Sequence, residues 1–189
     1  EDWGWGASVE DSEHILTRYI ELGGNFLDTA NGYTKGHSET IIGNYIRERD
    51  VRRDQLVVAT KFFTNLFPGD PNGGGASRKS VVAACDESLR RLQTDYIDLY
   101  QLHQPDASIS EEELLEPLAL LVEQGKVRYI GECNYGAWRH AITNLTAENN
   151  GWPVMVSSQN HYNILHRHVE LEVLPYCERF NVGFLPYFP

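Results

Sequence analysis

The sequence lacks long apolar runs and any excess of basic charge. Its richest apolar stretch, Leu114 to Val122, is interrupted by Glu116 and Pro117, so we expect no membrane span. Lysine and arginine number 16 against 27 acidic residues, which gives a net charge of −11. Because such a surface repels polyanions, a nucleic-acid partner is excluded.

Clustered cysteines and metal-ligand spacings are also missing. An odd number of widely spaced cysteines argues against a disulfide framework or a zinc knuckle and favours a reducing compartment, the cytoplasm. Three histidines lie close together in the sequence but lack HExxH spacing, so they predict a surface cluster and no metal site. These residues are Cys85, Cys133 and Cys177, and His161, His166 and His168.

What the sequence does contain is an alternation of short apolar runs with longer amphipathic runs. The apolar runs, which predict strands, cover residues 25–30, 56–61, 96–103, 127–134, 154–159 and 182–187. The amphipathic runs predict helices over 11–22, from Ser38 on, and over 77–92, 110–125, 137–146 and 168–180. Such alternation predicts right-handed βαβ crossovers and a parallel sheet in a single domain over residues 1–189.

Two α/β architectures fit this order: an open doubly wound sheet and the (β/α)₈ TIM barrel. A dinucleotide-binding open sheet needs GxGxxG after its first strand, whereas the chain reads Thr29-Ala30-Asn31-Gly32-Tyr33 there. A barrel needs eight units, and only six are recognisable. The fold is therefore either an incomplete barrel or an open sheet.

Each predicted strand closes with a polar side chain. In a parallel barrel the carboxyl ends of all strands open on one face, which carries the active site. Charged groups near buried strands need partners, so we expect these side chains to converge. They are Asp28, Lys61, His103, Asn134, Gln159 and Tyr187.

This set suits hydride transfer between a nicotinamide and a carbonyl. Asp28 keeps Lys61 protonated, and Tyr33, in the loop just beyond Asp28, can lean onto Lys61. An ammonium beside a phenol stabilises the phenolate, which makes Tyr33 a usable general acid. His103 can donate a hydrogen bond to the same substrate oxygen. The amides of Asn134 and Gln159 suit another amide, and Tyr187 offers a flat face for stacking.

The sequence resembles the aldo-keto reductases, in particular their aryl-alcohol dehydrogenase-like branch. Seven segments carry the resemblance: GGNFLDTANGY (23–33), SETIIG (38–43), VVATKF (57–62), SRKSVVAACDESLRRLQTDYIDLYQLH (77–103), GKVRYIGECN (125–134), SSQNHYNIL (157–165) and GFLPYFP (183–189). It implies a (β/α)₈ barrel, NADPH as cofactor and a small carbonyl or alcohol substrate. It also implies a catalytic tetrad of Asp28, Tyr33, Lys61 and His103, with Tyr33 as the proton donor.

The resemblance further implies that Asn134, Gln159 and the neighbouring Cys133 contact the nicotinamide carboxamide, and that Tyr187 stacks on its ring. The family commonly reads Gly-Val-Ser-Asn where this chain has Gly-Glu-Cys-Asn over residues 131–134. Cysteine is the weaker donor, and Glu132 must point outward or find a cation. The first and last barrel strands of the family are not recognisable in this chain, which we interpret as truncated.

Other features have simpler interpretations. The run 73–80 nearly spells a P-loop but has Arg78 where a glycine is required, so we predict a loop ending in a helix cap at Ser77. Residues 131–135 resemble a nucleophile elbow without its closing glycine. We expect His14, His37 and His140 to be solvated and Trp138 to pack inward. Trp3 and Trp5 either wall the pocket or cover the barrel.

Two alternatives to an oxidoreductase stay open. Some relatives of this fold sense nicotinamide nucleotides as channel subunits with little turnover. An incomplete barrel could also be inactive, and its unpaired strand edges would favour a homo-oligomer. The complete tetrad favours the enzyme.

Overall fold

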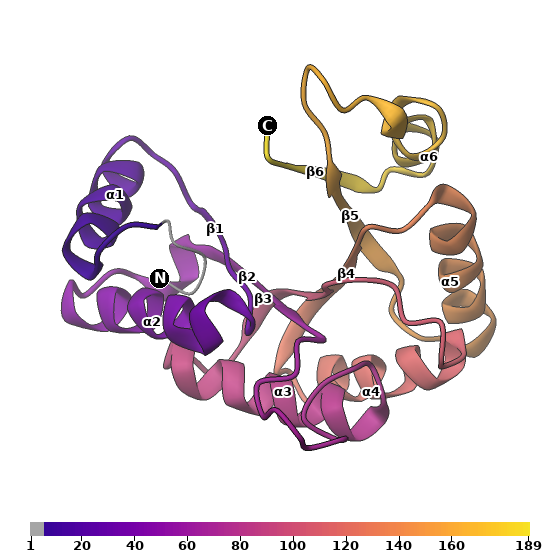
Figure 1. Cartoon of the computed structure of the whole chain (residues 1–189), viewed down its shortest axis with the longest axis horizontal. Helices are drawn as coiled ribbons and strands as arrows, with labels where there is room; N and C mark the ends of the chain where they lie inside the picture. Colours follow the sequence, from indigo (N-terminus) through magenta and orange to yellow (C-terminus); the bar gives the residue numbers. More distant parts are fainter. Residues whose placement is uncertain (1–5) are drawn as a thin grey trace.

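A computed structural model describes residues 6–189 and shows a curled sheet of six parallel strands (Figure 1). The strands lie side by side in sequence order, and neighbouring strands are parallel throughout. They are β1 (Phe26–Asp28), β2 (Val57–Phe62), β3 (Ile97–Leu102), β4 (Val127–Cys133), β5 (Met155–His161) and β6 (Gly183–Tyr187). The sheet forms a half-barrel, which confirms the incomplete (β/α)₈ barrel and excludes the doubly wound order.

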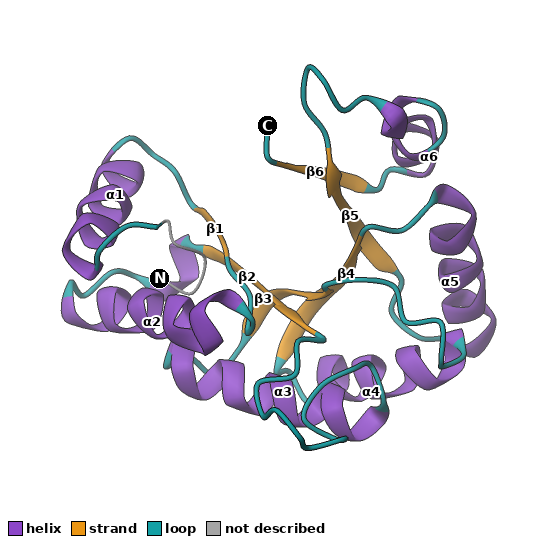
Figure 2. Ribbon diagram, in the orientation of Figure 1, coloured by secondary structure: helices purple, strands orange, loops and turns teal. Residues whose placement is uncertain are grey.

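The helices cover the convex face of this sheet, and the concave face opens toward the interior of the arc (Figure 2). The α-helices are α1 (Val9–Glu21), α2 (His37–Glu48), α3 (Arg78–Leu92), α4 (Glu111–Glu123), α5 (Ala137–Asn150) and α6 (Val173–Phe180). Short 3₁₀ turns cover Tyr33–Gly36, Arg53–Gln55 and His168–Glu170. Within residues 6–189, none of the helices has the length and apolarity that a membrane crossing requires.

The starts of α3 and α4 follow capping signals in the sequence, whereas the start of α2 does not. Ser77 and Ser110 accept hydrogen bonds from the backbone N–H groups of Ser80 and Glu113, as expected of N-caps. The helix predicted from Ser38 on has no serine cap: α2 begins at His37 behind Gly36, whose φ of 86° suits glycine. The Ser38 hydroxyl instead accepts a hydrogen bond from Thr29.

Of two further predicted helices, one is interrupted and the other is continuous. The predicted helix over 168–180 is interrupted, because a 3₁₀ turn at His168–Glu170 precedes a short α6 at Val173–Phe180. Pro117 lies inside α4, and that helix runs unbroken from Glu111 to Glu123.

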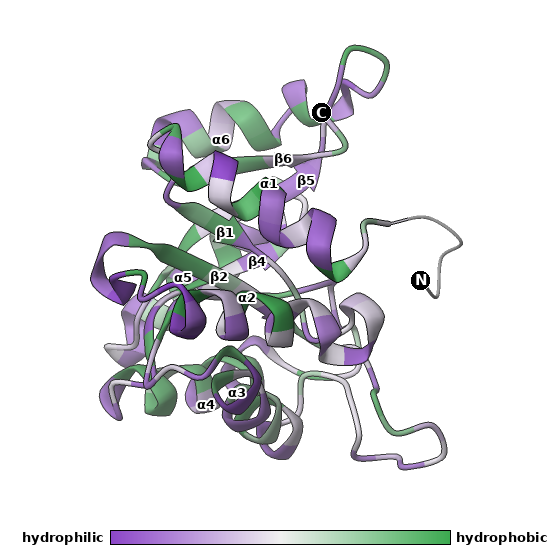
Figure 3. Ribbon diagram, turned by 90° about the vertical axis from the view of Figure 1, so that its left-hand side faces the viewer, coloured by the Kyte–Doolittle hydropathy of each residue, from purple (hydrophilic) through white to green (hydrophobic). Residues whose placement is uncertain are grey.

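The core lies between the sheet and its helices (Figure 3). Strand residues such as Val58, Ile97 and Ile130 pack in one cluster with α4 residues such as Leu115 and Leu118, all fully buried. Cys85 and Cys177 are buried helix residues, as predicted, and all three cysteines are free.

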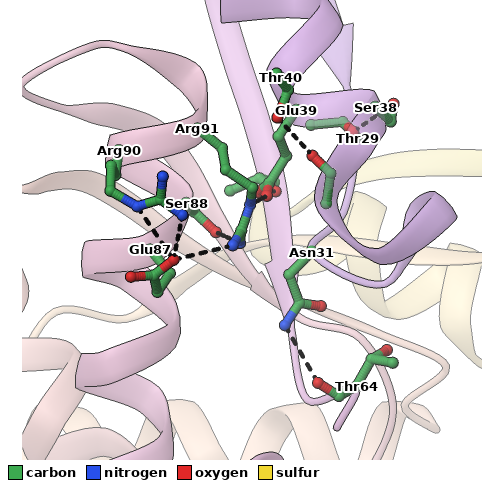
Figure 4. A network of polar contacts seen from close by, with 12 residues as sticks. Thr29, Asn31, Ser38, Glu39, Thr40, Thr64, Glu87, Ser88, Arg90 and Arg91 are labelled. Carbon is green, nitrogen blue, oxygen red and sulfur yellow. Dashed lines mark hydrogen bonds and ion pairs between the residues drawn. The ribbon is translucent and has the colours of Figure 1, made fainter. Parts of the chain in front are cut away.

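A buried polar network ties α2, α3 and β2 together (Figure 4). The fully buried carboxylate of Glu39 accepts hydrogen bonds from Arg91 Nε and from Thr60 Oγ1, each at 2.6 Å. Arg91 also contacts Glu87 and Ser88 on its own helix. A buried carboxylate is stable only with such partners, so the network fixes how the two helices pack.

Two predictions on α5 are wrong. Trp138 was expected to pack inward, but its side chain is 65% exposed. His140 was expected to be solvated, but it is buried beside Glu132. The face of α5 that meets the sheet carries His140, Thr143 and Ala147, so the Trp138 stripe points outward. His14 and His37 are exposed, as predicted, and Trp3 and Trp5 lie outside the described residues.

Candidate active site at the carboxyl ends of the strands

The six polar strand-end residues all lie at the carboxyl ends of the parallel strands. Asp28 and Tyr187 are the last residues of β1 and β6, and His103 and Asn134 directly follow β3 and β4. Lys61 lies one residue before the end of β2, and Gln159 lies two residues before the end of β5. The parallel register therefore brings residues that are far apart in sequence to one mouth.

Lys61 is the centre of the site. It is fully buried, and its Nζ donates to Asp28 Oδ2 at 2.6 Å and to the Thr29 carbonyl at 2.9 Å. Burial by itself lowers the pKa of Lys61, but attraction to Asp28 and Tyr33 outweighs burial and raises the pKa above its ordinary 10.5. Lys61 is therefore a fixed ammonium at neutral pH.

Tyr33 lies beside this ammonium. Lys61 Nζ is 3.5 Å from the phenol oxygen, and the Tyr33 ring meets the His103 ring edge-on at a centroid distance of 5.7 Å. The 3₁₀ turn after Tyr33 contains Thr34 and Lys35 with positive φ, so the loop is held in an unusual local conformation. Tyr33 is 38% exposed and thus faces the open side of the mouth.

His103 supplies a neutral imidazole. Burial lowers its pKa, the nearby Lys61 ammonium lowers it further, and the result is a pKa of about 4. Its Nδ1 is buried and lacks a hydrogen-bond partner among residues 6–189. A neutral imidazole has one donor and one acceptor nitrogen, so His103 can donate to a substrate oxygen at neutral pH.

Gln101 belongs to the site although the sequence analysis missed it. It is fully buried, pairs with Lys61 in the β2–β3 register, and donates through Nε2 to Asp28 Oδ1 at 3.2 Å. Gln159 donates to Asp28 Oδ2 at 3.2 Å from the other side. Two amides, those of Gln101 and Gln159, therefore fix the carboxylate that holds Lys61. The sequence feature that pointed to Gln101 is a polar residue inside an apolar strand, two positions before the strand-end His103.

The Asn134 side chain connects the carboxyl end of β3 with that of β6. Its Nδ2 donates to the His103 carbonyl at 3.1 Å, and its Oδ1 accepts from Tyr187 Oη at 2.8 Å. The Asn134 backbone has a φ of 65° and its N–H donates to the Gln159 carbonyl. The Tyr187 ring stacks on His161 at 5.2 Å with an interplanar angle of 11°, so one of its faces is covered.

The amide groups can take a nicotinamide carboxamide as a further partner. Asn134 and Gln159 each use one N–H in the contacts above, which leaves each a second N–H. Cys133 is different, because its thiol donates to Gln159 Oε1 at 3.6 Å and has no second proton. The remaining N–H groups of Asn134 and Gln159 thus suit the oxygen of a carboxamide. The Cys133 thiol donates to Gln159 and so helps to hold that side chain in place.

The alternative motifs find structural explanations. Burial raises the pKa of Cys133, the opposite of what a nucleophile needs. In the P-loop-like run, a side chain on Gly74 would collide with the Asn65 backbone, so this glycine serves close packing of the loop. His161 and His166 stack at 4.0 Å, and no group of metal-ligating residues suited to an ion occurs within residues 6–189.

Comparisons with known proteins agree with this arrangement. The model of the aldo/keto reductase family matches residues 2–189. Aldo-keto reductase AMT2 of Alternaria alternata is 36% identical, over 99% of this chain and 57% of that protein. C977.14c of Schizosaccharomyces pombe, named as an aryl-alcohol dehydrogenase, is 35% identical over 100% of this chain and 59% of that protein. Versiconal hemiacetal acetate reductase of Aspergillus parasiticus is 34% identical over 100% and 60%.

The chain thus spans somewhat more than half the length of these curated relatives. The match covers all six β/α units and every strand-end residue described above. The chain belongs to the aldo/keto reductase family, and its relatives include a protein named as an aryl-alcohol dehydrogenase.

Proposed function

We propose that the chain reduces aldehydes or ketones to alcohols with NADPH, with Tyr33 as the proton donor. The observation that carries this proposal is the contact of the buried Lys61 ammonium with both Asp28 and the Tyr33 phenol oxygen. A proton donor needs a neighbour that stabilises it after the proton has left, and Lys61 is such a neighbour. Asn134, Gln159 and Tyr187 are the residues that would hold the nicotinamide, with Cys133 beside them.

Each polar group has a separate task in this proposal. Tyr33 donates its proton to the substrate oxygen, and Lys61, held by Asp28, stabilises the phenolate that remains. The neutral His103 donates a hydrogen bond to the same oxygen and so orients the substrate. A bound nicotinamide supplies the hydride in one direction and accepts it in the other. No titration of His103 or Lys61 is required near neutral pH.

The setting of this activity is part of the same proposal. The substrates are small carbonyl compounds and the corresponding alcohols, and the compartment is the cytoplasm, which three free cysteines support. We also propose self-association through β1 and β6, because the edges of a parallel sheet carry backbone groups that another strand can pair with.

The test compares wild type with Tyr33→Phe in NADPH oxidation by an aromatic aldehyde. Loss of the proton donor is expected to lower turnover by about 10²-fold or more and to leave NADPH affinity unchanged. Tyr129→Phe is the matched control, because Tyr129 is 61% exposed on β4 and outside the site. Equal turnover in wild type and Tyr33→Phe would remove Tyr33 from the mechanism. NADPH binding by wild type without reduction of any carbonyl would favour a nucleotide-sensing module instead.

A further inference from the structure

A buried carboxylate lies directly beneath the turn that carries Asn134. Glu132, near the end of β4, is fully buried, and both of its oxygens have partners. Oε1 lies 2.9 Å from His140 Nδ1, and Oε2 accepts the backbone N–H of Tyr135 at 3.0 Å. A buried carboxylate without such partners would be strongly unfavourable, so the side chain is held in one position.

His140 completes a bridge from this carboxylate to the next strand. It is 1% exposed on α5, and its Nε2 lies 3.2 Å from the Met155 carbonyl of β5. A carbonyl only accepts, so Nε2 carries a proton, and one further proton is shared between Nδ1 and Glu132 Oε1. Asn144 brackets the same Met155 backbone with two hydrogen bonds, at 2.8 and 3.0 Å. The bridge therefore joins β4, α5 and β5 with every polar atom satisfied.

The turn held by this bridge has an unusual backbone. Asn134 has a φ of 65°, in the left-handed region that non-glycine residues seldom adopt. Two consecutive N–H groups fix it: that of Asn134 donates to the Gln159 carbonyl, and that of Tyr135 donates to Glu132. With the backbone so fixed, the Asn134 amide spans the His103 carbonyl and the Tyr187 hydroxyl.

We propose that Glu132 and His140 are positioning residues that hold Asn134 in its cofactor-binding geometry. The inference rests on the proposed function, because it takes Asn134 as a contact of the nicotinamide carboxamide. Glu132 contributes through the acceptor it offers to Tyr135, and His140 contributes by fixing the direction of the Glu132 side chain. Glu132 is fully buried and His140 is 1% exposed, so both act through Asn134 and not by direct contact with a ligand.

Two variants separate positioning from simple packing. Glu132→Gln keeps the shape and both hydrogen bonds, because its carbonyl accepts from Tyr135 and its amide donates to His140 Nδ1. The double variant Glu132→Leu with His140→Leu replaces the buried polar pair by apolar groups, a change that often preserves stability. It leaves the Tyr135 N–H without its acceptor. Glu132→Leu alone is avoided, since it strands His140 and could prevent folding.

The experiment measures NADPH affinity by fluorescence quenching, thermal midpoint, and hydrogen exchange of the Tyr135 amide in the 189-residue chain. For the double variant we expect a dissociation constant about 10-fold above wild type and a Tyr135 amide that exchanges about 10-fold faster or more. For Glu132→Gln we expect both values within about 2-fold of wild type. In an Asn134→Ala background, the double replacement should add less than about 2-fold, because its effect passes through Asn134.

Wild-type affinity in a folded double variant would overturn the inference, and so would a full additional loss in the Asn134→Ala background. These failures differ from a failure of the proposed function, in which wild type itself does not bind NADPH. In that case the hydrogen-exchange rate of the Tyr135 amide still tests whether Glu132 holds the turn. Equal exchange in wild type and the double variant would show that Glu132 does not hold the turn.

Discussion

Lys61 and Asp28 form an ion pair of 2.6 Å in which the lysine is fully buried and the aspartate side chain is 30% exposed. They come from adjacent strands, and the Asp28 carboxylate is also held by Gln101 and Gln159. The ammonium is thus fixed from the β1 side, and its third neighbour is the Tyr33 phenol oxygen at 3.5 Å. The Asp28 carboxylate thus has three partners, Lys61, Gln101 and Gln159, which fix it in place.

Asp28→Asn should destabilise the fold because it leaves the buried ammonium without its counter-charge. We expect the free energy of unfolding to fall by about 2–3 kcal/mol at neutral pH, measured by urea denaturation. The raised pKa of Lys61 means that this stabilisation is fully present below pH 10.5 and is lost as the pH rises through the raised value. The exposed pair of Asp86 and Lys126 supplies the control, and Asp86→Asn should have no measurable effect.

His103 should make stability depend on pH in the acid range. A free histidine takes up a proton near pH 6.5, whereas buried His103 does so only near pH 4. Between these values the unfolded chain binds a proton that the folded chain does not, so the free energy of unfolding falls as the pH falls.

We expect wild type to lose about 2 kcal/mol more than His103→Gln between pH 7 and pH 4, after allowance for the partial exposure of the ring. The comparison uses urea denaturation at both pH values. His14→Gln, at an exposed position, should behave like wild type. Identical pH profiles for wild type and His103→Gln would mean that the imidazole titrates normally.

Arg91→Gln should weaken the packing of α2 against α3. It removes the cation that contacts the buried Glu39 carboxylate at 2.6 Å, and we expect a loss of about 3 kcal/mol in the free energy of unfolding. Arg90→Gln is a matched control on the adjacent residue, because Arg90 pairs with Glu87 at the surface. Thermal or urea unfolding that fails to distinguish the two variants would contradict a structural role for the network in Figure 4.

Tyr187 should contribute to cofactor affinity mainly through its ring. Tyr187→Phe loses only the hydrogen bond to Asn134, so we expect the NADPH dissociation constant to rise by about 2- to 5-fold. Tyr187→Ala also removes the stacking face, and a rise of about 10-fold or more is expected. Fluorescence titration measures both. A larger effect of the phenylalanine variant than of the alanine variant would refute the stacking role.

The sequence by itself determined the parallel α/β order, and with it the edge of the sheet at which polar residues gather. Period-two and period-3.6 patterns are local, and the crossover rule converts them into a sheet with all carboxyl ends on one side. That reasoning selected Asp28, Lys61, His103, Asn134, Gln159 and Tyr187, which the fold does bring to one mouth. Their roles in chemistry stay predictions.

Only the tertiary structure decided which face of α5 is buried and what the polar residues inside the strands do. Helical periodicity shows which residues share a face but not which face meets the sheet, so Trp138 and His140 were assigned to the wrong sides. Gln101 and Glu132 are set in their places by partners from other elements, Asp28 on β1 and His140 on α5. Because the energy of a buried polar group depends on partners distant in sequence, the local pattern could not contain it.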